Sequence, residues 1–378
     1  SMSAAVNLTL QVTGSGTVQV QGVPVEASTF KMFPNAPFTL KAVAAPGYAF
    51  SGWTGVTGGE STSLTITGAS TIEAIFVPSN ETIIGGTLAT DTTLSSGSSP
   101  YVITDDLIVP AGITLTVPAG VEIRMNPERN IRVMGSLQVN GTASQKVNIV
   151  GRNGALWGGI SFENPSAPSA MAHAKVSGAT RGADPTKYPS AISGLNANLT
   201  LDFMDITENE GPVFTRGGIT TLRDSVLYNP HTGDCINVKQ GQAVTQRCTF
   251  LGNNAPDTDA IDYDGVANGL IEDCRIYRFQ GSNSDGIDVG EGCTNLLVQR
   301  NLIYFNSDKG FSVGQASTVI LRKNLVVGCV LGVGIKDAGS VATIDQNTFA
   351  DCDTGVAVYE KNFGDGGGEA IITNTIIS

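Results

Sequence analysis

Long apolar runs, basic residues, histidine and closely paired cysteines are all scarce in this sequence of 378 residues. No apolar run approaches the roughly 18 residues that cross a bilayer, which argues against membrane insertion. Lys and Arg total 22 against 34 Asp and Glu, so the formal net charge is −12. Because an encounter with phosphate would begin in a repulsive field, nucleic acid is not an expected partner. The only histidines are His173 and His231, and no cysteines have CxxC spacing, so zinc is not the expected metal.

Glycine, threonine, serine, asparagine and valine are abundant instead, in short runs. The chain has 46 Gly, and charged residues make up only 15% of it. Such runs suit strands and tight turns better than helices. With 41% hydrophobic residues, the chain can bury a sizeable core. We therefore predict an all-β protein with almost no helix.

Residues 1–80 form a distinct segment in which apolar and polar residues alternate. Runs such as VNLTLQV, GTVQVQG and TIEAIFV predict the strands of a small β-domain. The stretch from GSGTVQVQG through APGYAFSGW to AIF resembles the bacterial surface repeat related to the internalin B-repeat. This resemblance implies an exported bacterial protein with further domains. Tyr48, Phe50 and Trp53 could offer a sugar-stacking patch, but we expect them in the core of the small domain.

From residue 81 a repeat takes over and continues to residue 378. Equivalent positions recur at spacings of 23 to 27 residues: Ser225, Cys248, Cys274, Asn301, Asn324, Asn347 and Asn374. A period of this size, with short strands and no helix, predicts a right-handed parallel β-helix over residues 81–378. Its coils stack at about 4.8 Å, so like residues lie above like. The run VPAGITLTVPAGV resembles the first full coil of many exported bacterial β-helix proteins.

This register predicts which side chains point inward. Two apolar columns are expected in the core: Ile236, Ile261, Ile287, Phe311, Val333 and Val356, then Val238, Tyr263, Val289, Val313, Ile335 and Val358. The four asparagines of the repeat series are expected to form an internal amide ladder. We also expect a loop over residues 164–190, which contain four prolines, to leave the cylinder and wall a groove.

Cysteines fit the same register. Cys248 lies one repeat before Cys274, and Cys329 lies one repeat before Cys352. Each pair is expected to stack on adjacent coils. Because a small apolar side chain suits these positions, we favour buried thiols over disulfides.

Aspartates from two neighbouring coils converge in this arrangement. Asp259 and Asp285 are expected to stack in the turn before the inward isoleucines, with further aspartates on the strands beside them. Stacked like charges repel, and a bound cation removes that repulsion. Calcium prefers several hard oxygen ligands, which adjacent coils can supply. The predicted calcium ligands are Asp259, Asp262, Asp264, Asp285, Asp288 and Glu291, with Asp257 as a further ligand. The alternative is an ordinary polar turn of a β-helix.

Lysines follow the acidic residues along the same face. Lys309 replaces Asp285 in the turn column. Lys336 is expected in the outward column that Asp264 occupies two coils earlier. Beside calcium, either amine could abstract the proton next to a uronate carboxylate if its pKa is lowered towards neutrality. Either lysine could instead be a structural counter-ion. The candidate substrate-binding residues are Lys239, Asp308, Glu360 and Lys361.

The motif SDGIDV, flanked by aspartates one coil earlier and lysine one coil later, is similar to the calcium box of pectate-lyase-like enzymes, especially family nine polysaccharide lyases. That box begins with two adjacent aspartates, where this chain has Ser284. NSDGID also resembles a segment of polygalacturonase-type hydrolases, although their histidine-containing coil is missing. Residues 233–378 look like β-helix modules of large bacterial surface proteins as well.

These observations predict an exported protein, extracellular or at the bacterial cell surface, that recognises an acidic polysaccharide. The opening Ser-Met-Ser is typical of a cloning remnant, so a signal peptide is expected to have been removed. Calcium-assisted β-elimination and non-catalytic binding or scaffolding are the two leading alternatives, and a hydrolase is the third. The strand-like end at Ser378 exposes a sheet edge, so we expect further chain or another molecule to cover it.

Overall fold

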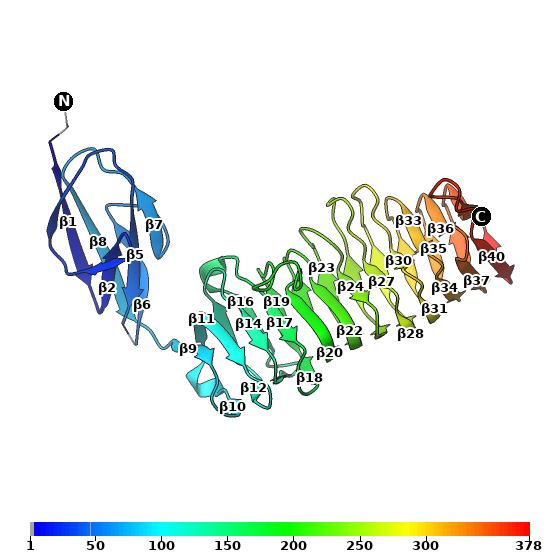
Figure 1. Ribbon diagram of the computed structural model, residues 1–378, viewed down its shortest axis with the longest axis horizontal. Coiled ribbons are helices and arrows are strands. Elements are labelled where there is room, and N and C mark those ends of the chain that lie inside the picture. Colours follow the sequence, from blue (N-terminus) through cyan, green and yellow to red (C-terminus); the bar gives the residue numbers. More distant parts are fainter. Residues whose placement is uncertain (1–3, 46) are drawn as a thin grey trace. The chain divides into compact units, whose positions relative to one another are not determined.

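The computed structural model describes residues 4–45 and 47–378 (Figure 1). Strands make up 55% of it and helix only 2%. The all-β prediction is therefore confirmed. No helix in the described ranges is long and apolar enough to span a membrane.

Contacts divide the chain into two compact units. The first runs to Ile83 and includes Ser98–Pro100, and the second comprises Ile84–Gly97 and Tyr101–Ser378. Strand β9 (Thr82–Thr87) crosses this division.

Two four-stranded sheets make up the first unit. Their strand orders are β4-β1-β8-β6 and β3-β2-β5-β7, and β1 and β8 run parallel. Leu8, Leu10, Leu40, Ile72 and Phe76 from both sheets share one buried core. The strands are β1 (Val6–Thr13), β2 (Gly16–Val20), β3 (Val23–Val25), β4 (Thr29–Met32), β5 (Phe38–Ala44), β6 (Tyr48–Thr54), β7 (Ser61–Leu64) and β8 (Ser70–Pro78).

Aromatic side chains of β6 belong to this core. Tyr48, Phe50 and Trp53 pack against it. The rings of Phe50 and Trp53 meet edge to face at 5.1 Å, and Trp53 Nε1 donates a hydrogen bond of 2.8 Å to the Gly59 carbonyl. The predicted core role of these residues is confirmed.

The second unit is a parallel β-solenoid of about 12 turns, whose coils stack along one axis in Figure 1. Each coil contributes strands to three columns, here called the first, second and third sheets. The first sheet contains β11 (Tyr101–Val109), β14 (Ile131–Val133), β17 (Ile160–Glu163), β20 (Ile192–Asp202), β22 (Val213–Arg223), β24 (Ile236–Lys239), β27 (Ile261–Asp264), β30 (Ile287–Gly290), β33 (Lys309–Val313), β36 (Leu331–Lys336) and β39 (Thr354–Tyr359).

The other two sheets repeat with the same register. The second sheet contains β10 (Thr92–Thr93), β12 (Thr114–Pro118), β15 (Ser136–Asn140), β18 (Ser169–Ala172), the ends of β20 and β22, β25 (Gln242–Gln246), β28 (Ala267–Glu272), β31 (Thr294–Gln299), β34 (Thr318–Arg322), β37 (Val341–Asp345) and β40 (Glu369–Thr373). The third contains the start of β11, β13 (Glu122–Met125), β16 (Val147–Gly151), β19 (Ala174–Ser177), β21 (Asp205–Thr207), β23 (Val226–Tyr228), β26 (Thr249–Leu251), β29 (Arg275–Tyr277), β32 (Leu302–Tyr304), β35 (Leu325–Val327), β38 (Thr348–Ala350) and β41 (Ile376–Ile377).

The corners between the sheets differ in length. From residue 242 onward, two residues join the second sheet to the third in every coil, for example 247–248 and 323–324. The connection from the third sheet to the first ranges from three residues (351–353) to fourteen (178–191). We call this variable connection the long corner. It is where irregular sequence can leave the cylinder without breaking the sheets.

The predicted inward columns are buried as expected through five coils. Ile261 pairs with Ile287 and Tyr263 with Val289, and all four side chains are buried. In the sixth coil, Val356 is only partly buried and Val358 is 46% exposed, because no further first-sheet strand covers them.

The amide ladder is confirmed at three of its four predicted positions. Asn324 Oδ1 accepts hydrogen bonds from the Asn301 main-chain N–H and side-chain amide, both at 3.0 Å, and Asn347 does the same for Asn324 at 2.9 Å. Asn374 was wrongly assigned to this ladder. It is the first residue of its two-residue corner, has φ 49° and is exposed, whereas Thr375 Oγ1 accepts the Asn347 N–H at 3.3 Å.

The predicted loop over 164–190 is wrong in its first half. Strands β18 and β19 occupy Ser169–Ala172 and Ala174–Ser177 and pair with their neighbouring coils. Only the second half leaves the cylinder, as the longest of the long-corner connections. All six cysteines are unbridged, and five are buried.

Replacing Asn324 by Ala should lower the free energy of unfolding by about 2 to 4 kcal/mol, because buried amide groups of Asn301 and Asn347 and the Val298 carbonyl lose their partner. Asn374→Ala is the matched control and should change it by less than about 0.5 kcal/mol. Urea unfolding followed by circular dichroism measures both. An equal loss in the two variants would contradict the reassigned ladder.

Candidate functional site

Three aspartates form a column where the long corner enters the first sheet. Asp234, Asp259 and Asp285 each stand two residues before an inward isoleucine. Each accepts the main-chain N–H of the equivalent residue on the next coil: Asp259 N–H to Asp234 Oδ1 at 2.9 Å, Asp285 N–H to Asp259 Oδ1 at 2.5 Å, and Lys309 N–H to Asp285 Oδ1 at 2.9 Å. Sequence reasoning missed Asp234, although its offset from Ile236 equals that of Asp259 from Ile261.

A second column on the adjacent strands faces the first. Asn237, Asp262 and Asp288 are in register on β24, β27 and β30. The Asn237 amide donates to Asp234 Oδ2 at 3.0 Å and to Asp262 Oδ2 at 2.5 Å. Its carbonyl oxygen is buried and has no hydrogen-bond partner among the described residues. A neutral oxygen without a donor, beside several carboxylates, suits a bound cation.

The aspartates of the two columns line a cavity of about 310 Å³, here called the acidic pocket. Carboxylate oxygens of Asp259, Asp285 and Asp288 lie within 4.8 Å of one another, a separation at which one ion can contact all three. The lining residues are Gly233, Asp234, Asp257, Asp259, Asp262, Asn283, Asp285, Asp288, Lys336 and Lys361.

Electrostatics within the acidic pocket disfavour full ionisation of its six aspartates. Burial, followed by the charges of Asp285 and Asp234, raises the pKa of Asp259 well above its usual range. Burial and the Asp234 charge raise the pKa of Asp262 to about 9, and burial raises that of Asp285 to about 6 against the opposing Lys309 charge. A cation would relieve this repulsion, since it stabilises the ionised carboxylates.

Asp264 and Glu291 lie outside this pocket, contrary to the prediction that they join the calcium ligands. Lys239 bridges them, with Nζ 2.6 Å from Asp264 Oδ2 and 3.1 Å from Glu291 Oε1. Asp264 stacks over Lys239 on the same face as Asp262, but two residues, or roughly 6.6 Å, further along the strand. The ammonium of Lys239, proposed as a substrate-binding residue, is therefore already paired with these two carboxylates.

Lys309 does not meet the requirement for a catalytic base. Its side chain is buried, and Nζ lies 3.3 Å from Asp285 Oδ1 and also pairs with Asp308. Burial lowers the pKa of Lys309, but the Asp285 charge and the Asp308 hydrogen bond outweigh it, so the net shift is upward. A base needs the opposite shift. Lys309 therefore ends the aspartate column as the counter-ion of Asp285. Asp308, proposed as a substrate-binding residue, forms a second ion pair with the same ammonium.

Lys336 is placed differently. It is 8% exposed, lines the acidic pocket, and its Nζ lies 3.6 Å from Asp288 Oδ1. Lys336 also lines an adjoining cavity of about 200 Å³, together with Gln315, Asp337 and Lys361. Lys361 is exposed at the rim of both cavities. Glu360 is exposed and accepts the Gly364 N–H, and it lines neither cavity.

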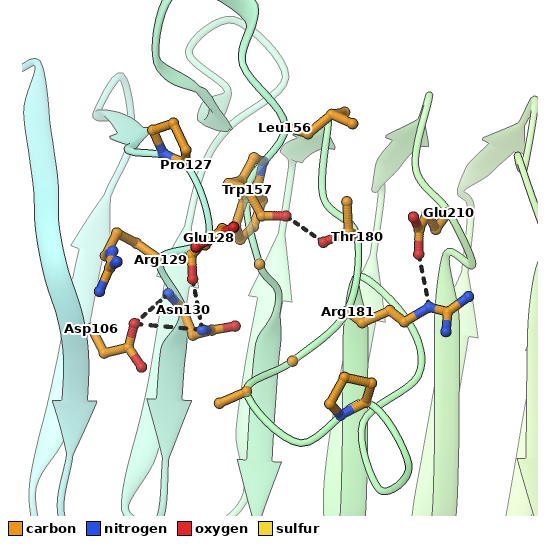
Figure 2. A pocket seen from close by; sticks show the side chains of 14 residues that line it. Asp106, Pro127, Glu128, Arg129, Asn130, Leu156, Trp157, Thr180, Arg181 and Glu210 are labelled. Carbon is orange, nitrogen blue, oxygen red and sulfur yellow. Dashed lines mark hydrogen bonds and ion pairs between the residues drawn. The ribbon is translucent and has the colours of Figure 1, made fainter. Parts of the chain in front are cut away.

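A larger groove of about 900 Å³ lies on earlier coils (Figure 2). Four long-corner connections wall it, and Thr180 to Pro185 come from the longest. Trp157 is buried, with Nε1 bonded to the Ser177 carbonyl at 2.8 Å, whereas Leu156 is 55% exposed. Sequence reasoning anticipated a groove wall here but none of its lining residues. The irregular coil lengths gave no register from which to find them.

Comparison with known proteins agrees with the two-part organisation. Residues 234–378 match the family model of the right-handed β-helix region, and residues 6–80 match that of the divergent InlB B-repeat domain. The resemblance of residues 1–80 to the InlB B-repeat and the predicted right-handed parallel β-helix are confirmed. The β-helix match includes every lining residue of the acidic pocket except Gly233, whereas the groove lies before it. No curated protein matches this chain.

Several solved structures are similar to the chain. An alginate lyase from a Paenibacillus species is 15% identical, with 71% of this chain and 93% of that chain covered and a TM-score of 0.40. The A-module of a mannuronan C-5 epimerase from Azotobacter vinelandii is 10% identical, with 76% and 91% covered and a TM-score of 0.39. The catalytic domain of an alpha-1,3-glucanase is 10% identical, with 96% and 86% covered and a TM-score of 0.38. Identities this low concern the fold alone.

Lys309→Met should lower the free energy of unfolding by about 3 kcal/mol, because Asp285 stays buried without its counter-charge. Lys336→Met should lower it by about 1 kcal/mol or less, because its contact with the partly exposed Asp288 is longer. Urea unfolding in the presence of a chelator compares them. If Lys336→Met proves the more damaging variant, the assignment of Lys309 as the structural lysine is wrong.

Proposed function

We propose that the acidic pocket binds calcium and, through it, the carboxylate of an acidic polysaccharide. The observation that carries this proposal is the convergence of Asp259, Asp285 and Asp288 within 4.8 Å, with Lys336 and Lys361 lining the same cavity. A pocket with carboxylates on one side and amines on the other can hold a cation and an anionic sugar together.

The chain's own residues would hold the ion with oxygen only. Asp259, Asp285 and Asp288 are the nearest ligands, and Asp234 and Asp262 extend the set. Neither histidine nor cysteine lines the pocket, so the ligand chemistry suits a hard cation rather than zinc. Calcium, when bound, would neutralise the sugar carboxylate and acidify the carbon-bound proton beside it.

A catalytic form of this proposal assigns the proton to Lys336. Its amine would take the proton from the carbon next to the carboxylate. The glycosidic C–O bond on the following carbon then breaks, its oxygen takes a proton from water, and the sugar is left unsaturated. Lys336 supports this role by lining the pocket without the two-carboxylate clamp that holds Lys309. Without such a reaction, the same site is a calcium-dependent binding surface.

A hydrolytic mechanism has less support. Its two candidate carboxylates, Asp285 and Asp308, are both paired to the Lys309 ammonium. An inverting hydrolase needs space for a water between two carboxyl groups about 6.5 to 9.5 Å apart. The ammonium takes up that space here.

Export to the cell surface or beyond is part of the proposal. The match of residues 6–80 to the divergent InlB B-repeat domain supports it, because the related repeats belong to bacterial surface proteins. Further domains in the natural protein would follow from the same resemblance.

Asp288→Asn and Asp259→Asn should each weaken calcium binding by at least about tenfold, because each removes a charged ligand. Asp264→Asn makes the same charge change nearby but outside the pocket, and should alter the affinity less than about twofold. Isothermal titration with calcium chloride measures all three. If the wild-type chain binds no calcium, or if Asp264→Asn is as harmful as Asp288→Asn, the site is wrong.

Lyase activity is tested by incubating the chain with pectate, alginate and glycosaminoglycans and following the ultraviolet absorbance of unsaturated ends. We expect a signal that a chelator abolishes and that Lys336→Met reduces by at least about a thousandfold. Calcium affinity should survive in that variant, because Lys336 is not a calcium ligand. Calcium-dependent binding without any unsaturated product would instead favour the non-catalytic form.

A further inference from the structure

The groove of Figure 2 and the acidic pocket lie on the same edge of the solenoid. Both are built from long-corner connections, where the chain passes from the third sheet to the first. Residues 127–130, 156–158, 180–185 and Glu210 line the groove, and residues 233–234, 257–259 and 283–285 continue the series in the acidic pocket. Because the coils stack in register, these connections follow one line along the solenoid axis.

The distance along that line is set by the sheet spacing. Six successive pairings of first-sheet strands lead from β14, which follows Arg129, to β30, which follows Asp285. At about 4.8 Å per coil, this is roughly 29 Å. The near ends are closer still, because Glu210 and Asp234 stand on adjacent coils. An extended polymer could therefore reach from one site to the other.

The groove differs from the acidic pocket in charge. Among the described residues, the Arg129 guanidinium makes no hydrogen bond or ion pair, although its side chain is half-buried. Two of the three acidic side chains in the groove are already engaged. Asp106 accepts the Asn130 N–H at 2.9 Å, and Glu210 pairs with Arg181 at 2.8 Å, as Figure 2 shows. Arg129 is thus a cation that can receive an anionic ligand.

The walls of the groove suit a sugar. Leu156, Pro127 and Pro185 offer apolar surface, beside the hydroxyl of Thr180 and the guanidinium of Arg181. Sugar rings combine carbon-bound hydrogens on their faces with hydroxyls at their edges, and recognition requires both kinds of contact. A planar guanidinium can bind a carboxylate through two parallel hydrogen bonds, with no metal between them.

We propose that this groove is a remote subsite for the polysaccharide that enters the acidic pocket, with Arg129 contacting a carboxylate of the polymer directly. This inference rests on the proposed function, since it takes the same ligand. It adds that recognition depends on chain length, and that one end of the polymer is held by guanidinium while the other is held through a cation.

The test uses whichever of sodium alginate or sodium pectate the wild-type chain binds, as a long polymer and as a trisaccharide too short to span six coils. Affinities are measured by isothermal titration with calcium present. Arg129→Ala should weaken polymer binding roughly tenfold, the effect of losing one charge-assisted contact, and leave trisaccharide binding unchanged. Arg275→Ala, which removes an exposed arginine from the third sheet, is the matched control and should change neither.

The possible results separate the two proposals. If Arg129→Ala leaves polymer affinity unchanged, or weakens polymer and trisaccharide equally, the remote subsite is wrong while calcium-dependent binding stands. If the wild-type chain binds neither polymer, or if Asp288→Asn binds the trisaccharide as well as wild type does, the proposed function fails and the subsite fails with it. The thermal midpoint of Arg129→Ala should match wild type, because its guanidinium has no partner to lose.

Discussion

Hydrogen bonding between successive coils is the constraint on which this molecule depends. Each first-sheet strand of the solenoid pairs in parallel with the equivalent strand one coil on, so a residue's vertical neighbour lies some two dozen positions away in sequence. This register buries the isoleucine columns and aligns the asparagine ladder. It also forces aspartates into contact, because a column has no way to separate its members without breaking the sheet. The acidic pocket is thus a consequence of the same pairing that stabilises the fold.

The aspartate column shows how such repulsion is contained. Each carboxylate accepts a main-chain N–H from the next coil, and the column ends on the Lys309 ammonium. These contacts favour the ionised form, whereas burial and neighbouring charges oppose it. Among the described residues, no lysine forms an ion pair with Asp259 or Asp262. This part of the pocket therefore lacks a compensating positive charge. In the proposed calcium site, the preference for a hard cation would come from its all-oxygen ligands, and backbone pairing would hold those ligands in place.

Much of this could be predicted from sequence, and the failures have physical causes. The period of the repeat predicted the fold, the inward columns and the meeting of Asp259, Asp285 and Asp288. Asn374 was misplaced because the last repeat spans 28 residues and not the 27 that the sequence alignment assumed. The extra residue places Thr375 in the ladder. The ion pairs of Lys309 and Lys239 could not be predicted, because a residue's column does not reveal which charges its long side chain reaches. A groove wall was expected within residues 164–190, but the rest of the groove lining was missed because coils before residue 225 have no constant period.

The uneven lengths of the connections separate two roles within one chain. From residue 242 onward, the corners between the second and third sheets keep two residues in every coil, and three of them contain the asparagines of the amide ladder. The long corner varies from three to fourteen residues without disturbing the pairing of the strands it joins. Mutational change should therefore accumulate along this one edge, where a lengthened loop affects only adjacent coils. Related proteins could diversify their ligands there while inheriting an unchanged cylinder.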